Sequence, residues 1–464
     1  MRSHTAGGMA LLIFCSTLGS GSPAGPRWVA AQELPPPTLA TSFATSLDSV
    51  PRSAAWFLEL GQRSDLTNEQ FIEFEDLFID STFAGDRPRL VSDPEGRIAG
   101  LLSAGWSHAG IDRGDRRRFR ADFEWGTQVQ RSALEAEWAA ATASGWRWLL
   151  APRTEYREDR TFDRDQREWR GAATAAVRRD LDDGMNSFEL RLRGDGLRAS
   201  GTSSTSLLDR NTAGATLAFD HSGLLSDARL AYSLAARAFP DSASRDHVEH
   251  VGEASVRAIL EGGQLFTFET RVVRRAARRE QRISRDDFWQ PEASTELAIH
   301  PGATTRVRLA AEGEGIAYDR PDSALYFDSQ RFRGVAAAEW ERAGGLRLEL
   351  EAAHEWAFAP AAPAEEYGEW SSTLRLGRLG AGAWWSLEPR IGWRSYATSN
   401  GIESGAPSSF VFYEGLVQLE QPLPAGLLAR VTATARSEEH DDASQDARSF
   451  WLTAELRWRV AGSR

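Results

Sequence analysis

The chain has 464 residues, of which 41% are apolar and 26% charged, and it carries a formal net charge of −12. All 54 basic residues are arginines spread along an acidic chain, which argues against a nucleic-acid-binding protein with one concentrated basic face. The only cysteine is Cys15, so the chain after it can form neither disulfides nor thiolate metal sites.

Residues 1–31 have the features of a secretory signal peptide. Arg2 supplies a positive start, and the apolar run Met9–Leu18 that follows is too short to span a bilayer. The small residues Ala30–Ala31 then provide a cleavage point. We therefore expect an exported protein that loses residues 1–31. Residues 32–52, rich in proline, serine and threonine, are expected to form a periplasmic linker.

Residues 53–96 allow two interpretations. Alternating apolar residues from Trp56 to Leu60, and again from Phe74 to Phe78, favour a first pair of strands. The sequence Thr67-Asn68-Glu69-Gln70 resembles a capping box, which favours a short helix instead. Both interpretations stay open at this point.

From residue 97 to residue 464, apolar and polar residues alternate over long stretches. The clearest apolar set is Phe450, Leu452, Ala454, Leu456, Trp458 and Val460. Similar alternation occurs at residues 188–193, 229–236 and 346–352. A period of two places the two sets on opposite faces of a strand, whereas no helix would bury such a stripe.

The length of these stretches and the connections between them indicate the architecture. Several run 11 to 14 residues, for example Trp146–Arg157 and Thr304–Ala317. A strand of about 12 residues, tilted by ~40°, rises roughly 30 Å, enough to cross the apolar band of an outer membrane. Short turns rich in glycine and proline alternate with long polar connections, as in membrane barrels. The sequence predicts an all-β fold, an antiparallel up-and-down transmembrane β-barrel of roughly 18–20 strands.

Two soluble folds compete with this prediction. A β-propeller also repeats at about 40 residues, but its strands are short and no blade signature recurs here. A soluble sandwich would bury its tryptophans, of which the chain has 17. Many tryptophans lie near predicted strand ends, where the aromatic girdles of a membrane barrel are found. Examples are Trp138, Trp146, Trp169, Trp340, Trp370, Trp393 and Trp458.

These features resemble the general class of bacterial outer-membrane β-barrels, and porin-like channels within it. The resemblance covers residues 97–460 and includes the last strand, FWLTAELRWRV, which is similar to the terminal targeting signal of such barrels. Four residues follow Val460, so the match to that signal is imperfect. The resemblance implies the outer membrane of a Gram-negative-type bacterium, with both termini periplasmic. It also implies contacts with outer-membrane lipid, lipopolysaccharide and the barrel-assembly machinery.

Candidate catalytic and metal-binding groups are sparse. His247-Val248-Glu249-His250 places two imidazoles three residues apart, which is weak spacing for a metal in a strand or loop, with no evident third ligand. Gly194-Asp195-Gly196-Leu197 resembles a block found in lipolytic enzymes, with Gly196 where the nucleophilic serine would stand. A Ser-His-acid triad on the wall stays open, but no local sequence marks one. We expect no catalytic residue, no metal and no cofactor.

The polar face of the alternating stretches is rich in charge. The residues expected to line the lumen are Arg147, Arg153, Arg191, Arg193, Glu269, Arg271, Arg306, Arg308, Glu349, Glu351, Arg375, Arg430, Glu455, Arg457 and Arg459. Such groups need water or partners, because an unpaired buried charge is costly. A barrel of about 18 strands is wide enough for an aqueous channel. Alternatively, these residues form salt bridges that only brace the wall.

The sequence therefore predicts an outer-membrane channel for passive diffusion of small hydrophilic solutes. Because inward arginines outnumber inward carboxylates in this set, a mild anion preference is expected. Two alternatives remain. One is a loop-occluded structural or binding barrel at the cell surface. The other is a barrel-wall lipid hydrolase, which requires a serine, a histidine and an Asn or Asp to converge at the membrane rim.

Overall fold

The computed structural model describes residues 55–79, 82–109, 115–160, 166–181, 184–201, 209–277, 287–321, 326–379, 382–397 and 407–463. The predicted signal peptide (1–31) and linker (32–52) lie outside the described residues. No helix within these ranges is long and apolar enough to cross a membrane.

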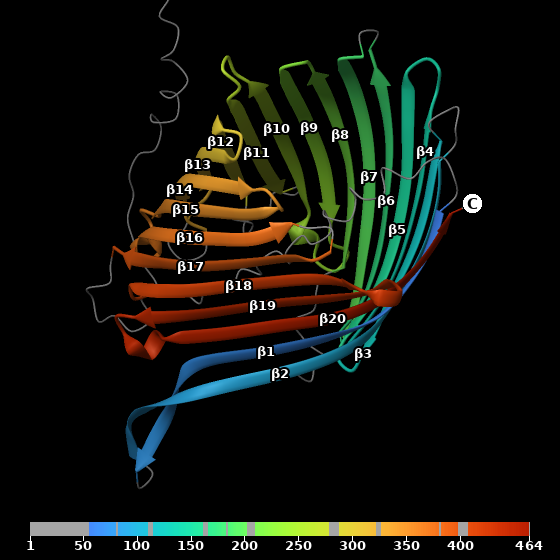
Figure 1. The fold of residues 1–464 in the computed structure, drawn as a ribbon. Coiled ribbons are helices and arrows are strands. Elements are labelled where there is room, and N and C mark those ends of the chain that lie inside the picture. The colour runs from blue at the N-terminus through green and yellow to red at the C-terminus, as the bar shows by residue number, and fades with distance from the viewer. Residues whose placement is uncertain are drawn as a thin grey trace, which may run out of the picture.

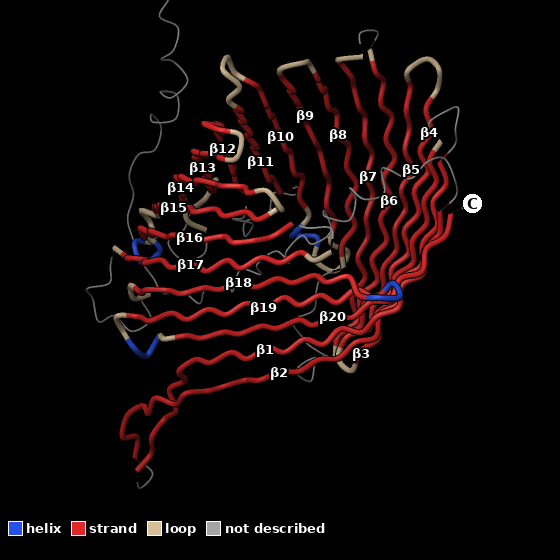
Figure 2. The backbone as a smooth tube through the Cα atoms, viewed as in Figure 1, coloured by secondary structure: helices blue, strands red, loops and turns tan. Residues whose placement is uncertain are grey.

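Twenty antiparallel strands form one continuous sheet (Figure 1). They are β1 (Ala55–Ile79), β2 (Thr82–Ala109), β3 (Arg116–Gly126), β4 (Val129–Ala141), β5 (Trp146–Asp159), β6 (Gln166–Asp180), β7 (Asn186–Gly201), β8 (Arg210–Ser222), β9 (Ser226–Ala238), β10 (His247–Ile259), β11 (Leu265–Ala277), β12 (Phe288–Gly302), β13 (Thr305–Tyr318), β14 (Ser329–Arg342), β15 (Leu346–Phe358), β16 (Tyr367–Leu379), β17 (Trp384–Tyr396), β18 (Phe410–Leu423), β19 (Leu427–His440) and β20 (Ala447–Ser463). In the described parts of the chain, helical segments are limited to three-residue 3₁₀ turns between strands (Figure 2).

The sheet closes on itself through its first and last strands. β1 pairs with β20 from Ala55 opposite Ser463 to Phe71 opposite Ala447. Closure leaves no free strand edge along the wall, which is the condition that a membrane-spanning sheet must meet. The predicted antiparallel barrel is confirmed, with 20 strands.

The first four strands differ from the expectation in their boundaries. Residues 55–79 form one continuous strand, β1, and not two strands or a helix. The stretch 116–141 holds two strands, β3 and β4. The capping-box sequence at 67–70 is extended because β2 and β20 both pair with it, and these long-range ladders override a local preference for helix.

β1 and β2 continue beyond the rest of the barrel. The pairing of β20 with β1 ends at Phe71, and that of β3 with β2 ends at Ala99. The β1–β2 pairing itself goes on to Ile79 opposite Thr82. The two strands therefore leave the wall as a two-stranded ribbon (Figure 1, blue).

The two faces of the wall have opposite character. On β20, Leu456 is 46% exposed and Trp458 is 41% exposed, whereas Glu455, which directly precedes Leu456, is only 8% exposed. The same alternation holds along the other strands, and the seven tryptophans singled out in the sequence are all exposed. A closed sheet with its apolar side chains outside and its charged side chains inside is the reverse of a soluble barrel. It matches a wall whose outer solvent is lipid.

Tight turns close one end of the barrel. Between β14 and β15, Gly344 and Gly345 adopt φ values of 96° and 77°, which residues with a Cβ rarely adopt. The opposite end carries the longer connections, as the alternation in the sequence predicted.

Six of these longer connections share one closure. A residue at or near the end of the strand before the connection donates its backbone N–H to the carboxylate that directly precedes the next strand. The pairs are Ala199 with Asp209, Phe239 with Asp246, Ala277 with Asp287, Tyr318 with Asp328, Ala359 with Glu366 and His440 with Asp446, at 2.6 to 3.2 Å. We call these acceptors the loop-base carboxylates. Each satisfies a backbone donor where the ladder of the sheet ends.

Candidate functional site: the charged lumen

A cavity of about 1510 Å³ lies inside the barrel against β1–β7 and β18–β20. We call it the main cavity. Six of the predicted lumen residues line it, namely Arg153, Arg193, Arg430, Glu455, Arg457 and Arg459. Strands from both ends of the sequence build it, because the closure between β1 and β20 brings them side by side.

The lining of the main cavity is charged and largely paired. It contains eleven arginines and eight carboxylates, a net of three positive charges. Arg430 Nη2 lies 2.6 Å from Glu420 Oε2, and Arg457 Nη1 lies 2.6 Å from Glu59 Oε1. Ion pairs of this kind are partly open to the cavity, so each adds little to stability but holds its side chains in place.

Two smaller cavities lie on the opposite wall. One of about 750 Å³ is lined by residues of β9–β17, among them the predicted Glu269 and Arg271. The other, of about 220 Å³, is lined by residues that include the predicted Arg306, Arg308 and Glu349. Basic and acidic residues nearly balance in both linings.

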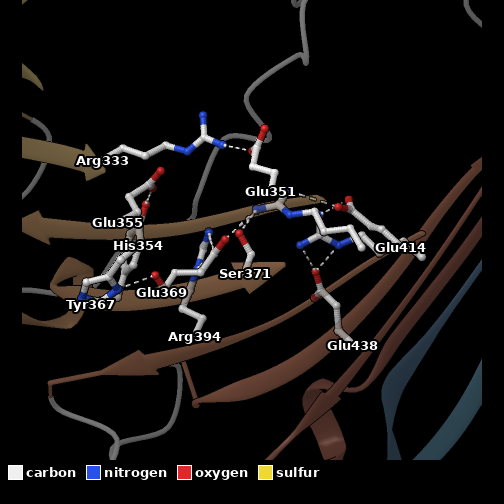
Figure 3. Close-up of polar contacts among 12 residues, drawn as sticks. Arg333, Glu351, His354, Glu355, Tyr367, Glu369, Ser371, Arg394, Glu414 and Glu438 are labelled. Carbon is white, nitrogen blue, oxygen red and sulfur yellow. Dashed lines mark hydrogen bonds and ion pairs between the residues drawn. The ribbon is translucent and has the colours of Figure 1, made fainter. Parts of the chain in front are cut away.

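Between these cavities runs a continuous set of ion pairs on β13–β19, which we call the ion-pair ladder (Figure 3). Glu351 is 4% exposed and accepts hydrogen bonds from Arg308 at 2.8 Å, Arg375 at 2.9 Å and Arg333 at 3.2 Å. Each arginine comes from a different strand. The negative charge of a buried carboxylate with three guanidinium partners is fully compensated. Loss of that carboxylate would leave the positive charges of the guanidinium groups unpaired.

A second node of the ladder lies on β16 and β17. Glu369 accepts from Arg390 at 2.8 Å and from Arg394 at 2.6 Å (Figure 3). The Arg394 guanidinium lies 4.2 Å from the centre of the Tyr367 ring, a cation–π contact. Tyr367 in turn donates its hydroxyl to Glu355 at 2.6 Å. These contacts link β15, β16 and β17 across the inner surface of the wall.

The remaining predicted residues line none of these three cavities. Arg147 donates to Asp180 at 2.8 Å, and Arg191 Nη2 lies 2.6 Å from Glu189. Glu351 and Arg375 belong to the ladder. All fifteen predicted residues nevertheless share the face opposite the exposed apolar side chains.

Several residues of the interior were not singled out in the sequence. Phe57 and Arg118 line the main cavity. Phe57 falls within residues 53–96, for which the sequence left two interpretations open. Arg333, Glu369 and Arg394 belong to the ladder. Their inward position follows from the alternation on β14, β16 and β17, so the signal was present for these three.

No family model matches the chain, and no curated protein sequence matches it. Several solved structures, however, match the chain. A mutant ferric enterobactin receptor from Pseudomonas aeruginosa, in complex with enterobactin, has a TM-score of 0.53 at 9% identity, covering 86% of this chain and 81% of that one. The copper transporter OprC has a TM-score of 0.52 at 9% identity, covering 85% and 80%. At such identities the likeness concerns the fold.

The chain is an outer-membrane β-barrel. This statement rests on the closed sheet of 20 strands, its apolar outer surface and its likeness to those two structures. What the outer-membrane barrel carries or binds does not follow from the fold.

The candidate metal pair does not come together in the outer-membrane barrel. His247 is buried on the inner face, where Nδ1 bonds the Arg245 carbonyl oxygen at 2.8 Å. His250 is on the outer face, with Nδ1 2.6 Å from the Tyr232 hydroxyl. Within the described ranges, no three His, Cys, Asp or Glu residues gather to hold a metal ion.

A serine, a histidine and an acid do meet, but on the inner face. Ser408 Oγ lies 3.0 Å from His440 Nδ1, and His440 Nε2 lies 3.3 Å from Glu438. Ser408 is buried and also bonds Gln445, while Glu438 is shared with Arg436 at 2.7 Å. The cluster ties together the bases of two connections. It is not at the lipid-facing rim where a lipid hydrolase would need it.

Proposed function

We propose that the barrel is a passive channel for small hydrophilic solutes, with a mild preference for anions. The observation that supports this proposal is the main cavity, whose charged lining has a net of three positive charges. Fixed cations raise the local concentration of anions in a water-filled passage. The preference should fade as salt shortens the Debye length below ~10 Å.

Reversal potentials across a salt gradient in planar bilayers test this proposal. Replacement of Arg430, Arg457 and Arg459 by glutamine removes three positive charges from the main cavity and should move selectivity toward cations. A matched triple variant replaces Arg117, Arg179 and Arg378 by glutamine; these three lie on the outward face of their strands, so the change should leave selectivity unchanged. A conducting pore whose selectivity ignores the first triple change would contradict the assignment of the lining.

A second candidate is a braced barrel that binds at the cell surface and does not conduct. The ion-pair ladder favours it, since the arginines that contact Glu351 and Glu369 are already paired across the wall. Absence of conductance from folded, reconstituted protein would support this candidate over the channel.

We further propose that the protein resides in the outer membrane with both termini in the periplasm and without residues 1–31. Ala55 and Ser463 lie opposite each other, so β1 begins and β20 ends at the same end of the barrel. That end carries the tight turns. A C-terminal epitope that antibodies reach only after permeabilisation would support the orientation. Mass spectrometry of the purified protein would test the removal of residues 1–31.

A further inference from the structure

Two arginines of the main cavity differ from the other nine. The nine form ion pairs with carboxylates. In the part of the chain that the structure describes, Arg118 on β3 and Arg459 on β20 have no carboxylate within ion-pair distance. A guanidinium without a protein carboxylate is free to form the bidentate contact that matches a carboxylate of a solute.

Phe57 on β1 stands between these two strands. The Arg459 guanidinium lies 5.1 Å from the centre of the Phe57 ring. The ring extends over Gly105 of β2, where the Cβ of any other residue would collide with it. Gly105 pairs with Phe57 of β1 and with Arg120 of β3. Arg118 therefore lies two residues along β3 from the residue that is level with Phe57.

The lining of the main cavity also contains apolar side chains away from Phe57. Leu101 is opposite Gly61, four residues along β1 from Phe57, whereas Leu416 and Trp451 are at the level of Thr67, ten residues along β1. An inward tryptophan is unusual for this wall, whose large apolar side chains mostly face outward. The main cavity thus combines two cations that lack ion pairs with aromatic and aliphatic surface.

We infer that this part of the main cavity binds small organic monoanions that carry an aromatic ring, with benzoate as the simplest representative. The carboxylate would contact Arg118 or Arg459, and the ring would contact Phe57. Acetate lacks the ring and benzamide lacks the charge, so each would lose one of the two contributions. The inference rests on the proposed function only in that solutes must reach the cavity.

Calorimetric titration of the folded barrel in detergent with sodium benzoate, sodium acetate and benzamide tests this inference. Benzoate should bind more tightly than either of the others. Arg459→Gln and Arg118→Gln should each weaken benzoate binding about tenfold, equivalent to about 1.4 kcal/mol. Phe57→Leu keeps an apolar side chain but removes the ring, and should weaken benzoate binding without altering that of acetate.

Arg147→Gln is the matched control, because Arg147 faces inward but lies outside the main cavity, paired with Asp180. It should bind benzoate like the unaltered protein. Equal binding of benzamide and benzoate, or unchanged benzoate binding in both Arg459→Gln and Arg118→Gln, would overturn the inference. Heat-dependent gel mobility verifies that each variant is folded.

Conductance separates this inference from the proposed function. A protein that conducts potassium chloride but shows no preference for benzoate keeps the channel proposal and overturns the site. A protein that binds benzoate through Arg118 and Arg459 but never conducts keeps the site and overturns the channel.

Discussion

Two arginine substitutions on β20 test which face of the wall contacts lipid. Leu456 lies near the middle of β20 and is 46% exposed on the outer face, whereas Thr453 faces the main cavity and donates its hydroxyl to Asp65 at 2.6 Å. An arginine on the lipid side near mid-membrane costs about 2–4 kcal/mol. Thr453→Arg loses one hydrogen bond, about 1 kcal/mol. It also places a cation beside the Asp65 carboxylate, which offsets part of that loss.

Denaturant unfolding in lipid vesicles, followed by tryptophan fluorescence, measures both free energies. The two variants introduce the same side chain on the same strand, three residues apart and on opposite faces. We expect Leu456→Arg to lose at least 1 kcal/mol more than Thr453→Arg, in line with those two magnitudes. Equal losses would refute the assignment of the two faces.

Three further predictions concern the interior and the loop bases. Glu351→Gln leaves three guanidinium groups with one fewer charged partner each and should lower the free energy of unfolding by about 3 kcal/mol in the same assay. The control is Glu341→Gln, which should cost under about 1 kcal/mol because Glu341 forms no ion pair among the described residues. Similar costs for the two variants would contradict the ion-pair ladder. Asp246→Ala removes the acceptor of the Phe239 N–H and should hasten tryptic cleavage after Arg245, with an unchanged cleavage rate counting against the loop-base closure. Ser408 should resist labelling by a fluorophosphonate, because it is buried and Glu438 is shared with Arg436; labelling lost in Ser408→Ala would instead support a hydrolase.

The sequence was sufficient to predict the strands of the barrel wall wherever the alternation of apolar and polar residues was unbroken. Between Trp146 and Val460 the chain forms sixteen strands, β5–β20, and the total of 20 lies within the predicted range of roughly 18–20. The period of two also placed Glu455 inside and Trp458 outside. One face of each strand contacts lipid and the other faces the polar interior, so the period of two is visible in the sequence of a single strand. It can be recognised without knowing which strands pair with it.

The first strands and the contacts of the lumen could not be read in the same way. The extended conformation of residues 67–70 depends on β20, which is almost 400 residues away, and a local capping pattern contains no information about that partner. Glu351 meets Arg308, Arg333 and Arg375 only because the registers of four strands align them. Register is a property of strand pairs, so which charges neutralise each other, and hence which arginines remain available, emerges only from the assembled sheet.

The loop-base carboxylates also affect how freely the sequences of the longer connections can vary. Each closure uses a backbone N–H and one acidic residue at the boundary, and the spans closed range from 6 to 10 residues. Residues between the two ends take no part in that hydrogen bond, so their identity and number can change while the closure is kept. Peptides inserted between Phe239 and Asp246 should for the same reason leave the register of β9 and β10 undisturbed.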